Sequence, residues 1–333
     1  MVDGSRAGPA GEPASASVRS PRLSDGIHGR GAGDRVYSVV LTLFALAVPA
    51  LLLLIFTVVT VGAWPALRRF GFEFVTSTVW DPVAGRFGAG PALYGTLVSS
   101  VVALILATPL ALGSAIFLTE FAPRRLRRPV AFVVDLLAAI PSVVYGLWGI
   151  FVLLPLLRAH VMPFLRDTLH LGATPFFRGP AYGPSMLAAG VILAIMILPY
   201  ISAVSREVLM AVPRSQREAA LALGATRWEM LWGAVIPFAK SGIAGGVILG
   251  LGRALGETMA VTMVIGNAAR ISASLFQPGY TMASLIANEF TEATGELHLS
   301  ALLAVGFVLF LVTLVVNAGA RWLVWRTSLE RGS

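Results

Sequence analysis

The chain has 333 residues, of which 56% are hydrophobic and only 13% are charged. Soluble domains carry about 25% charged residues, so this composition excludes an ordinary soluble domain and indicates a membrane protein. Cysteine is absent, which excludes disulfide frameworks, cysteine zinc sites and thiol catalysis. The formal net charge is +8, but the arginines lie in short clusters between apolar runs, which is typical of membrane topology rather than of nucleic-acid binding.

Residues 1–35 are rich in Gly, Ser, Pro and Ala and lack a periodic apolar pattern. This composition predicts a disordered tail, because it offers too little apolar surface to bury. The chain does not begin with a basic stretch, a short apolar run and a small-residue cleavage site. We therefore expect the first apolar run to be an uncleaved anchor, which with the outer loop after it occupies residues 36–92.

Six stretches are long and apolar enough to cross a membrane, which takes about 20 residues each. The predicted spans are Val36–Leu67, Leu93–Leu118, Pro129–Leu157, Met186–Ser205, Ser241–Ala269 and 297–320. Only the third and fifth contain charged residues. Asp135 in the third is expected near the cytoplasmic headgroups, paired with Arg127 or Arg128.

The distribution of basic residues predicts the orientation of the spans. If the N-terminus is cytoplasmic, the inner segments hold 17 of the 25 basic residues and the outer segments hold seven. Cytoplasmic loops carry the excess of basic residues, so both termini are expected in the cytoplasm. The predicted fold is an all-α polytopic membrane protein with six transmembrane helices.

A loop of about 35 residues separates the fourth and fifth spans on the cytoplasmic side. Ser215 and Glu218 have the spacing of a capping box that begins a helix, and Gly224 is suited to end it. Thr226 and Glu229 form a second capping box. The loop is therefore predicted to contain a short helix, a sharp corner and a second helix that returns to the membrane.

The short helix has two interpretations. Glu218 can serve only to cap its own helix, which the box would explain fully. Alternatively, the small alanine-rich helix lies at the membrane face and docks into a partner's cleft, with Arg217 or Glu218 supplying a directional contact.

The fifth span carries Arg253 and Glu257 in a segment predicted to be one helix. Charged residues near the bilayer centre cost about 2.5–3.5 kcal/mol on insertion scales, so they persist where they face protein or water. A stripe of small residues (Gly242, Gly246, Gly250 and Ala254) is expected on the same sector, for close helix contact. The two charges are expected to pair four residues apart, either as a structural contact between helices or as a gate for an oxyanion, whose shape suits the arginine fork.

The long loop contains Glu218-Ala219-Ala220, then Gly224 three residues after Leu221, then Pro237 at its end. This pattern resembles the EAA motif of ABC importer permeases, although Ala234 stands where the family usually has Ile. The resemblance implies a coupling helix at 213–224, held in a groove of a cytoplasmic ATPase. The implied coupling residues are Arg217, Glu218, Ala219, Ala220 and Gly224.

Residues 252–261 and 137–146, with 198–201, are similar to signatures of the phosphate-specific ABC transport permeases of the PstC type. The similarity covers roughly residues 90–325. It implies a type I importer permease core over 93–325, a cytoplasmic tail at 326–333, and a place in the bacterial plasma membrane. Arg253 and Glu257 would then line the substrate pathway.

The resemblance also implies a set of partners. These are a PstA-type permease as heterodimer, two ATPase subunits, an extracytoplasmic phosphate-binding protein, inorganic phosphate and the lipid bilayer, with no nucleic acid. The only lysine, Lys240, follows Ala239, so the chain lacks the Gly-Lys-Ser/Thr phosphate loop. We therefore expect a non-catalytic subunit with no cofactor of its own, whose partner ATPase binds ATP and Mg.

Three alternatives stay open. The chain could serve another oxyanion, sulfate or molybdate, or it could be the sister PstA-type subunit. A different class is an ion-coupled anion carrier without an ATPase, which would have no need for the long cytoplasmic corner.

Overall fold

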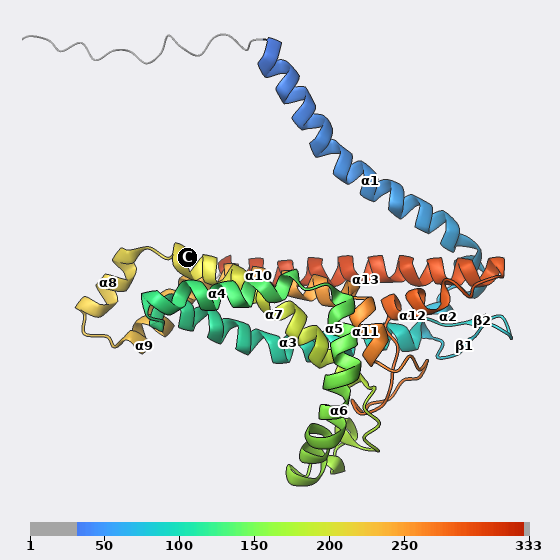
Figure 1. Ribbon diagram of the computed structural model, residues 1–333. Helices are drawn as coiled ribbons and strands as arrows, with labels where there is room; N and C mark the ends of the chain where they lie inside the picture. The colour runs from blue at the N-terminus through green and yellow to red at the C-terminus, as the bar shows by residue number, and fades with distance from the viewer. Residues whose placement is uncertain (1–31, 330–333) are drawn as a thin grey trace, which may run out of the picture. The chain divides into compact units, whose positions relative to one another are not determined.

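The computed structural model describes residues 32–329, and these residues are mostly helical (Figure 1). The chain divides into two units, one ending at Leu54 and the other beginning at Ile55. Of the predicted tail at 1–35, residues 1–31 lie outside the described residues. Residues 32–35 are helical and do not belong to a tail, since helix α1 (Ala32–Phe70) already begins at Ala32.

The described chain has six helical stretches long and apolar enough to cross a membrane, which confirms the predicted number. The first, second, fourth and sixth lie where the sequence placed them, with longer ends. The six stretches are Asp34–Phe70, Gly90–Phe121, Ser142–Thr168, Met186–Ala211, Arg227–Gly256 and Glu296–Arg326. The helices in the last five are α3 (Gly90–Ile116), α5 (Ser142–Trp148) with α6 (Leu154–Leu156), α7 (Met186–Ala211), α9 (Arg227–Met230) with α10 (Ile236–Gly256), and α13 (Glu296–Leu329). The predicted tail at 326–333 therefore starts too early, because α13 continues to Leu329.

The third predicted span is wrong as a single helix. Helix α4 (Arg124–Ala139) ends before Pro141, and α5 then leaves in a different direction (Figure 1). A proline disfavours the helical conformation of the residue before it, and Ile140 accordingly has an extended backbone with ψ 127°. The amphipathic helix α4 is thus separate from the apolar stretch that begins at Ser142.

Several membrane helices continue through prolines by means of wide π-helical turns. The turns Gly149–Leu153, Leu157–Val161 and Leu231–Val235 each end two residues before a proline: Pro155, Pro163 and Pro237. In each case the residue just before the proline donates its N–H to a carbonyl five residues back. A proline in a regular helix clashes with the carbonyl four residues back, so the wider turn lets the helix continue.

Helix α7 is the central helix of the second unit, packed between α3 and α10. Glycines of α10 allow the α10–α7 contact: Gly242 faces Val208, Gly246 faces Val204, and Gly250 faces Ile201. A Cβ placed on Gly250 would lie only 2.8 Å from Cγ1 of Ile201. The predicted small-residue stripe is thereby confirmed as a surface for close helix contact.

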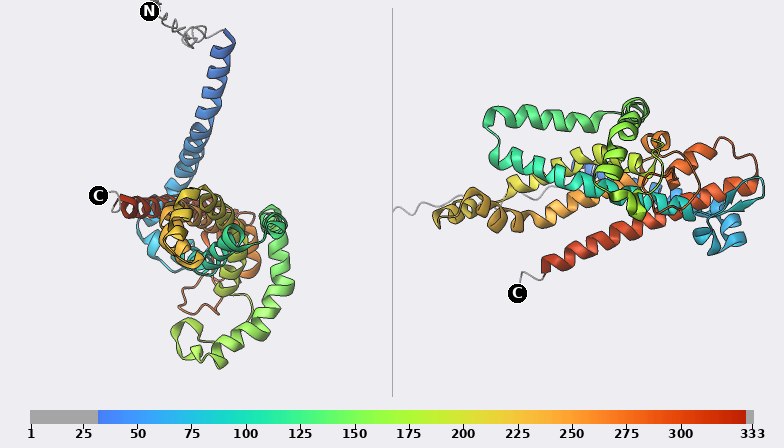
Figure 2. Two further views of the ribbon diagram at one scale, coloured as in Figure 1. Left: turned by 90° about the vertical axis from the view of Figure 1, so that its left-hand side faces the viewer. Right: turned by 90° about the horizontal axis from the view of Figure 1, so that it is seen from below.

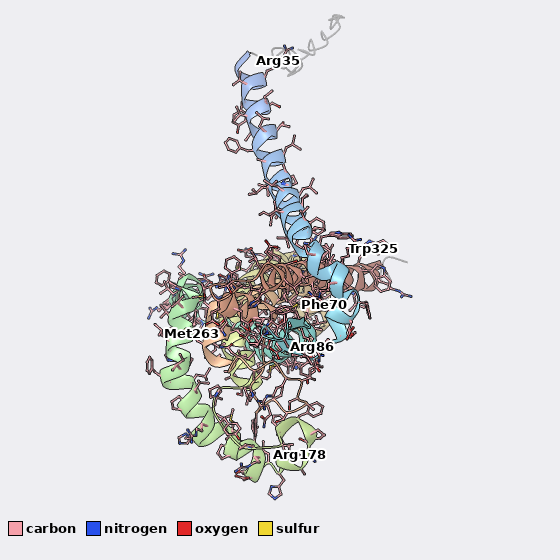
Figure 3. All side chains as sticks on the ribbon, turned by 90° about the vertical axis from the view of Figure 1, so that its right-hand side faces the viewer. Arg35, Phe70, Arg86, Arg178, Met263 and Trp325 are labelled. Atoms are coloured by element: carbon pink, nitrogen blue, oxygen red, sulfur yellow. The ribbon has the colours of Figure 1, made fainter. Side chains whose placement is uncertain are left out.

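Short elements complete the two ends of the second unit. Near the start of α13 lie α2 (Glu73–Thr76), the antiparallel pair β1 (Trp80–Asp81) and β2 (Arg86–Phe87), and α12 (Met282–Glu289). At the opposite end, α8 (Arg214–Ala222) and α9 follow α7. The short α11 (Met259–Val264) follows α10 and contacts α5 and α12. An arm formed by α5 and α6 leads away from the main bundle (Figure 2), and Arg178 lies on the loop that returns from it (Figure 3).

Candidate functional site

Arg253 lies in the last turn of α10, with its side chain exposed on the surface of this chain. Its guanidinium carbon is 4.6 Å from the ring centre of Tyr200 on α7. A cation over an aromatic face is stabilised by about 0.5–2 kcal/mol, because the face carries partial negative charge. The ring has no net charge, so Arg253 is held in place without being neutralised.

A cavity of about 1000 Å³ opens beside Arg253, lined by α7, α10 and α13. Helices α10 and α13 are in contact, and they diverge toward the C-terminal end of α13 (Figure 2, right). Most of the lining is glycine, alanine or larger apolar side chains. The polar exceptions, apart from Arg253, are Tyr200, Thr313, Asn317 and Arg321. A water molecule occupies about 30 Å³ in the liquid, so the cavity is large enough for a hydrated oxyanion.

The predicted ion pair between Arg253 and Glu257 is not formed. Helix α10 ends at Gly256, and Glu257 has an extended backbone with ψ 127°. The two residues therefore do not share a helix face, and their four-residue spacing does not bring their side chains together. The Glu257 carboxylate instead accepts a hydrogen bond from the backbone N–H of Ala260, 3.4 Å away, at the start of α11.

The position of Glu257 changes the chemistry open to Arg253. Among the ion pairs of the described residues, none involves Arg253. A partnerless arginine in a membrane helix persists where it faces water or a ligand. Its planar fork of N–H donors matches two oxygens of a carboxylate or phosphate group. The site can therefore attract an oxyanion without first displacing a carboxylate.

Tyr200 also connects the site to the broken third span. Its hydroxyl donates to the carbonyl of Ala138, 3.4 Å away, and the Tyr145 hydroxyl donates to the carbonyl of Leu137 at 2.8 Å. Both carbonyls belong to the last turn of α4, just before the break at Pro141. Tyr200 thus touches Arg253 with its ring and α4 with its hydroxyl.

The expected partners of Asp135 are wrong. Its carboxylate pairs with Arg206 of α7 at 3.0 Å, not with Arg127 or Arg128. Arg127 instead donates to the carbonyl of Ala122. Helix α4 packs against α7, so Asp135 meets an arginine of that helix rather than one close to it in the sequence.

The predicted corner between the fourth and fifth spans is present, with two differences. No side chain caps α8, which begins after Pro213, so the predicted box of Ser215 and Glu218 is not formed. The second box is confirmed, since Thr226 and Glu229 bond reciprocally. Gly224 has φ +87°, which confirms it as the residue that turns the chain out of the helix. The second helix is not separate, because α9 runs into α10 through a π-helical turn.

The five predicted coupling residues face different surroundings. Glu218, Ala219 and Gly224 are exposed, and Ala220 is partly buried. Arg217 points inward: its guanidinium pairs with Glu120 at 3.0 Å and donates to the carbonyls of Leu209 and Val212 at the end of α7. The exposed face, which includes the 90% exposed Leu223, is available to another protein, whereas Arg217 attaches α8 to the membrane helices.

Three residues of the cavity were missed from the sequence. Tyr200 was noted only as part of a family signature, although it follows Pro199 in the middle of a span. Asn317 and Arg321 were placed at a span end, although they stand four residues apart in line with Thr313. Polar residues at this spacing in an apolar helix share one face, which was a usable signal. In the part of the chain that the structure describes, no three His, Asp or Glu side chains could together hold a metal ion.

The family model of binding-protein-dependent transport system inner membrane components matches residues 107–329, two thirds of the chain. The chain belongs to this family. It is an inner-membrane permease component, in agreement with the six apolar helices and with a subunit that is not an enzyme. The EAA-like corner and the last four of the six apolar stretches lie within the matched region.

Curated relatives are similar over most of their length. A protein of Mesorhizobium japonicum is 50% identical over 82% of this chain and 84% of its own. Proteins of Pasteurella multocida and Mycobacterium tuberculosis are 47% and 43% identical, each over 87% of this chain and 91% of their own. The first two are named phosphate transport system permease protein PstC, and the third PstC 2.

Solved structures support the fold. A chain of a bacterial alginate ABC transporter aligns with a TM-score of 0.59 at 17% identity, covering 90% of this chain and 98% of its own. A chain of the MetNI methionine ABC transporter aligns with a TM-score of 0.51 at 17% identity, covering 71% of this chain and 94% of its own. The architecture is therefore that of an ABC importer permease.

Proposed function

We propose that this permease carries inorganic phosphate across the inner membrane as part of an ATP-driven importer. The observation that carries the proposal is Arg253, a guanidinium that stands on a cavity wall with no carboxylate partner among the described residues. The names of relatives up to 50% identical point to the same substrate. Glu257, close in sequence but turned away, would contribute by shaping the break between α10 and α11 rather than by neutralising Arg253.

The contacts of Arg217 suggest how ATPase movement would reach the site. A partner ATPase that holds the exposed face of α8 would pull on α7 through the bonds of Arg217 to Leu209 and Val212. Tyr200 lies nine residues before Leu209 on the same helix, a rise of about 14 Å. Since Tyr200 supports Arg253, a displacement of α7 would move the ring that holds the arginine. Alternating access would then be a rocking of the permease against its partner around Arg253.

This function requires further subunits. We propose a heterodimer with a PstA-type permease and two ATPase chains that bind ATP and Mg. A phosphate-binding protein outside the membrane would deliver the substrate. The exposed position of Arg253 on this isolated chain fits a pathway completed by the second permease.

The substrate is tested by uptake into vesicles that contain the complete transporter. Labelled phosphate should accumulate only when ATP and the loaded binding protein are present, and a tenfold excess of sulfate should leave uptake unchanged. Inhibition by sulfate or molybdate at low concentration would favour the other oxyanions. Uptake driven by an ion gradient in the absence of any ATPase would instead indicate a carrier.

A further inference from the structure

Helix α13 carries a line of polar residues into the cavity that contains Arg253. Thr313, Asn317 and Arg321 are spaced by four residues, and all three line the cavity. The other α13 residues in the lining are Phe310, Leu314 and Ala318. The polar line is therefore one face of an otherwise apolar helix.

The packing of α10 against α13 fixes the order of these groups. A Cβ added at Gly252 would lie 3.7 Å from Nδ2 of Asn317, so Asn317 is level with the residue next to Arg253. Consecutive membrane spans run in opposite directions, and α13 runs back toward the end that carries α8. Arg321 is one turn beyond Asn317, about 6 Å further toward that end. A solute that leaves Arg253 toward the cytoplasm meets Asn317 first and Arg321 next.

The side chains of Asn317 and Arg321 have no polar partner elsewhere in the described part of the chain. Within the described residues, no ion pair involves Arg321 and no hydrogen bond involves the Asn317 amide. Arg326, one turn later, differs: it stacks on Trp322 at 5.5 Å and does not line the cavity. Asn317 and Arg321 together offer amide and guanidinium donors, and no carboxylate between Ala32 and Leu329 pairs with this arginine.

We propose that Asn317 and Arg321 form a second oxyanion-binding station on the cytoplasmic side of Arg253. This station receives phosphate as it passes from Arg253 toward the cytoplasm. The proposal rests on the proposed transport function and extends it from one residue to a sequence of two stations. Conduction through a pore needs sites that are favourable enough to enter and weak enough to leave. A second cation one step further inward meets this requirement, because it lowers the cost of leaving Arg253.

The phosphate group of an anionic lipid has the same chemistry as the free ion, so the experiment must separate the two. The chain has no cysteine, so Ala318→Cys places a single thiol on this chain beside the proposed station. The variant is assembled into the complete transporter in phosphatidylcholine vesicles. Its labelling rates by an anionic and by a neutral methanethiosulfonate are measured with and without inorganic phosphate.

Charged cavities raise local counter-ion concentration and rates by about 10-fold or more, so Arg321→Gln should lower the anionic-to-neutral labelling ratio at least about threefold. Arg321→Lys should keep the ratio, and Arg326→Gln, the matched control, should leave it unchanged. Inorganic phosphate should slow anionic labelling only while Arg321 is present. An unchanged ratio in Arg321→Gln would overturn the proposal.

Whether a lipid headgroup occupies the station in place of free phosphate is tested by adding phosphatidylglycerol to the vesicles. If free phosphate uses the station, protection by phosphate persists in the mixed vesicles. If phosphatidylglycerol itself blocks labelling and phosphate has no effect, a headgroup occupies the site and the station is wrong.

Measurements of phosphate uptake distinguish an error in the second station from an error in the proposed transport function. Arg321→Gln should slow phosphate uptake several-fold while the loaded binding protein binds the transporter as before. If Arg253→Gln stops uptake but Arg321→Gln changes neither uptake nor labelling, only the second station is wrong. Normal uptake in Arg253→Gln would remove the role of Arg253, whereas a complete unaltered transporter that takes up no phosphate would remove the proposed function itself.

Discussion

Arg217 of helix α8 and Glu120, at the end of the second span, form an ion pair 3.0 Å long. Both side chains are mostly buried, at 19% and 12% exposed. The same guanidinium reaches the carbonyls of Leu209 and Val212. One side chain therefore connects α8 with two membrane helices, which makes it the main candidate for transmitting force from the proposed ATPase partner.

Replacing Arg217 by alanine should uncouple ATP hydrolysis from uptake. The loss leaves Glu120 and two carbonyls without their donor, which costs about 1–3 kcal/mol for a buried unsatisfied group. Transport per ATP hydrolysed should fall about tenfold or more in reconstituted complexes, which corresponds to such a cost. Arg214→Ala, an exposed arginine on the same helix, is the matched control. Equal coupling in the two variants would contradict the role of Arg217.

Gly224 should matter for the corner after α8 because of its backbone conformation, not because a side chain there would meet neighbouring atoms. Its φ is +87°, and a Cβ added there would meet no atom within 4 Å. A residue other than glycine pays about 1–2 kcal/mol in this region, and asparagine tolerates it best. Gly224→Val should therefore reduce the amount of ATPase that co-purifies, while Gly224→Asn should keep most of it. The corner would not depend on this turn if both variants bound the ATPase equally.

The absence of a side chain at Gly250 should allow α10 to approach α7 closely. Gly250→Ala forces a methyl group against Ile201, and overpacking of this kind costs about 1–3 kcal/mol. The apparent melting temperature of the purified complex should fall by several degrees, at about 2–4 °C per kcal/mol. Gly113→Ala, on α3, adds a methyl group in open space and should cause no such fall. A similar melting temperature for both variants would show that the helices separate without cost.

Tyr200 should act through its ring more than through its hydroxyl. The hydroxyl bond to Ala138 is long, at 3.4 Å, whereas the ring lies under the Arg253 guanidinium. Tyr200→Phe should keep uptake within about threefold of the original, and Tyr200→Leu should lower it about 2- to 30-fold, the range of a cation–π contact. Uptake rates at limiting phosphate distinguish the two. Equal losses would instead assign the effect to the hydroxyl.

Much of the fold was predictable because apolar length and the distribution of arginines are strong signals in membrane proteins. The corner between the fourth and fifth spans was also predictable, since Thr226, Glu229 and Gly224 act through local backbone geometry. The breaks inside spans were harder. Pro141 carried a signal for a break, yet the apolar run continued across it, and length alone favoured one helix.

The candidate site shows where sequence spacing fails. Arg253 and Glu257 would pair only if the helix continued, but α10 stops at Gly256 and Glu257 caps the next helix instead. The true neighbour of Arg253 is Tyr200, which lies 53 residues earlier in the chain and is brought near by the close packing of α10 on α7. Asn317 and Arg321 likewise reach the cavity through tertiary packing. The polar spacing on α13 indicated a shared face, but nothing local in the sequence indicated which helix that face would meet.

The most direct measurement is phosphate uptake by complexes in which Arg253 is replaced by glutamine. Hydrogen bonds to charged groups are worth about 1.5–3 kcal/mol, so uptake should fall by about 10- to 150-fold. Arg270→Gln, on the connection after α11, removes the same charge away from the cavity and should leave uptake unchanged. Co-purification of the partner subunits should be the same in both variants. Uptake within twofold of the original in fully assembled Arg253→Gln complexes would contradict Arg253 as the phosphate partner.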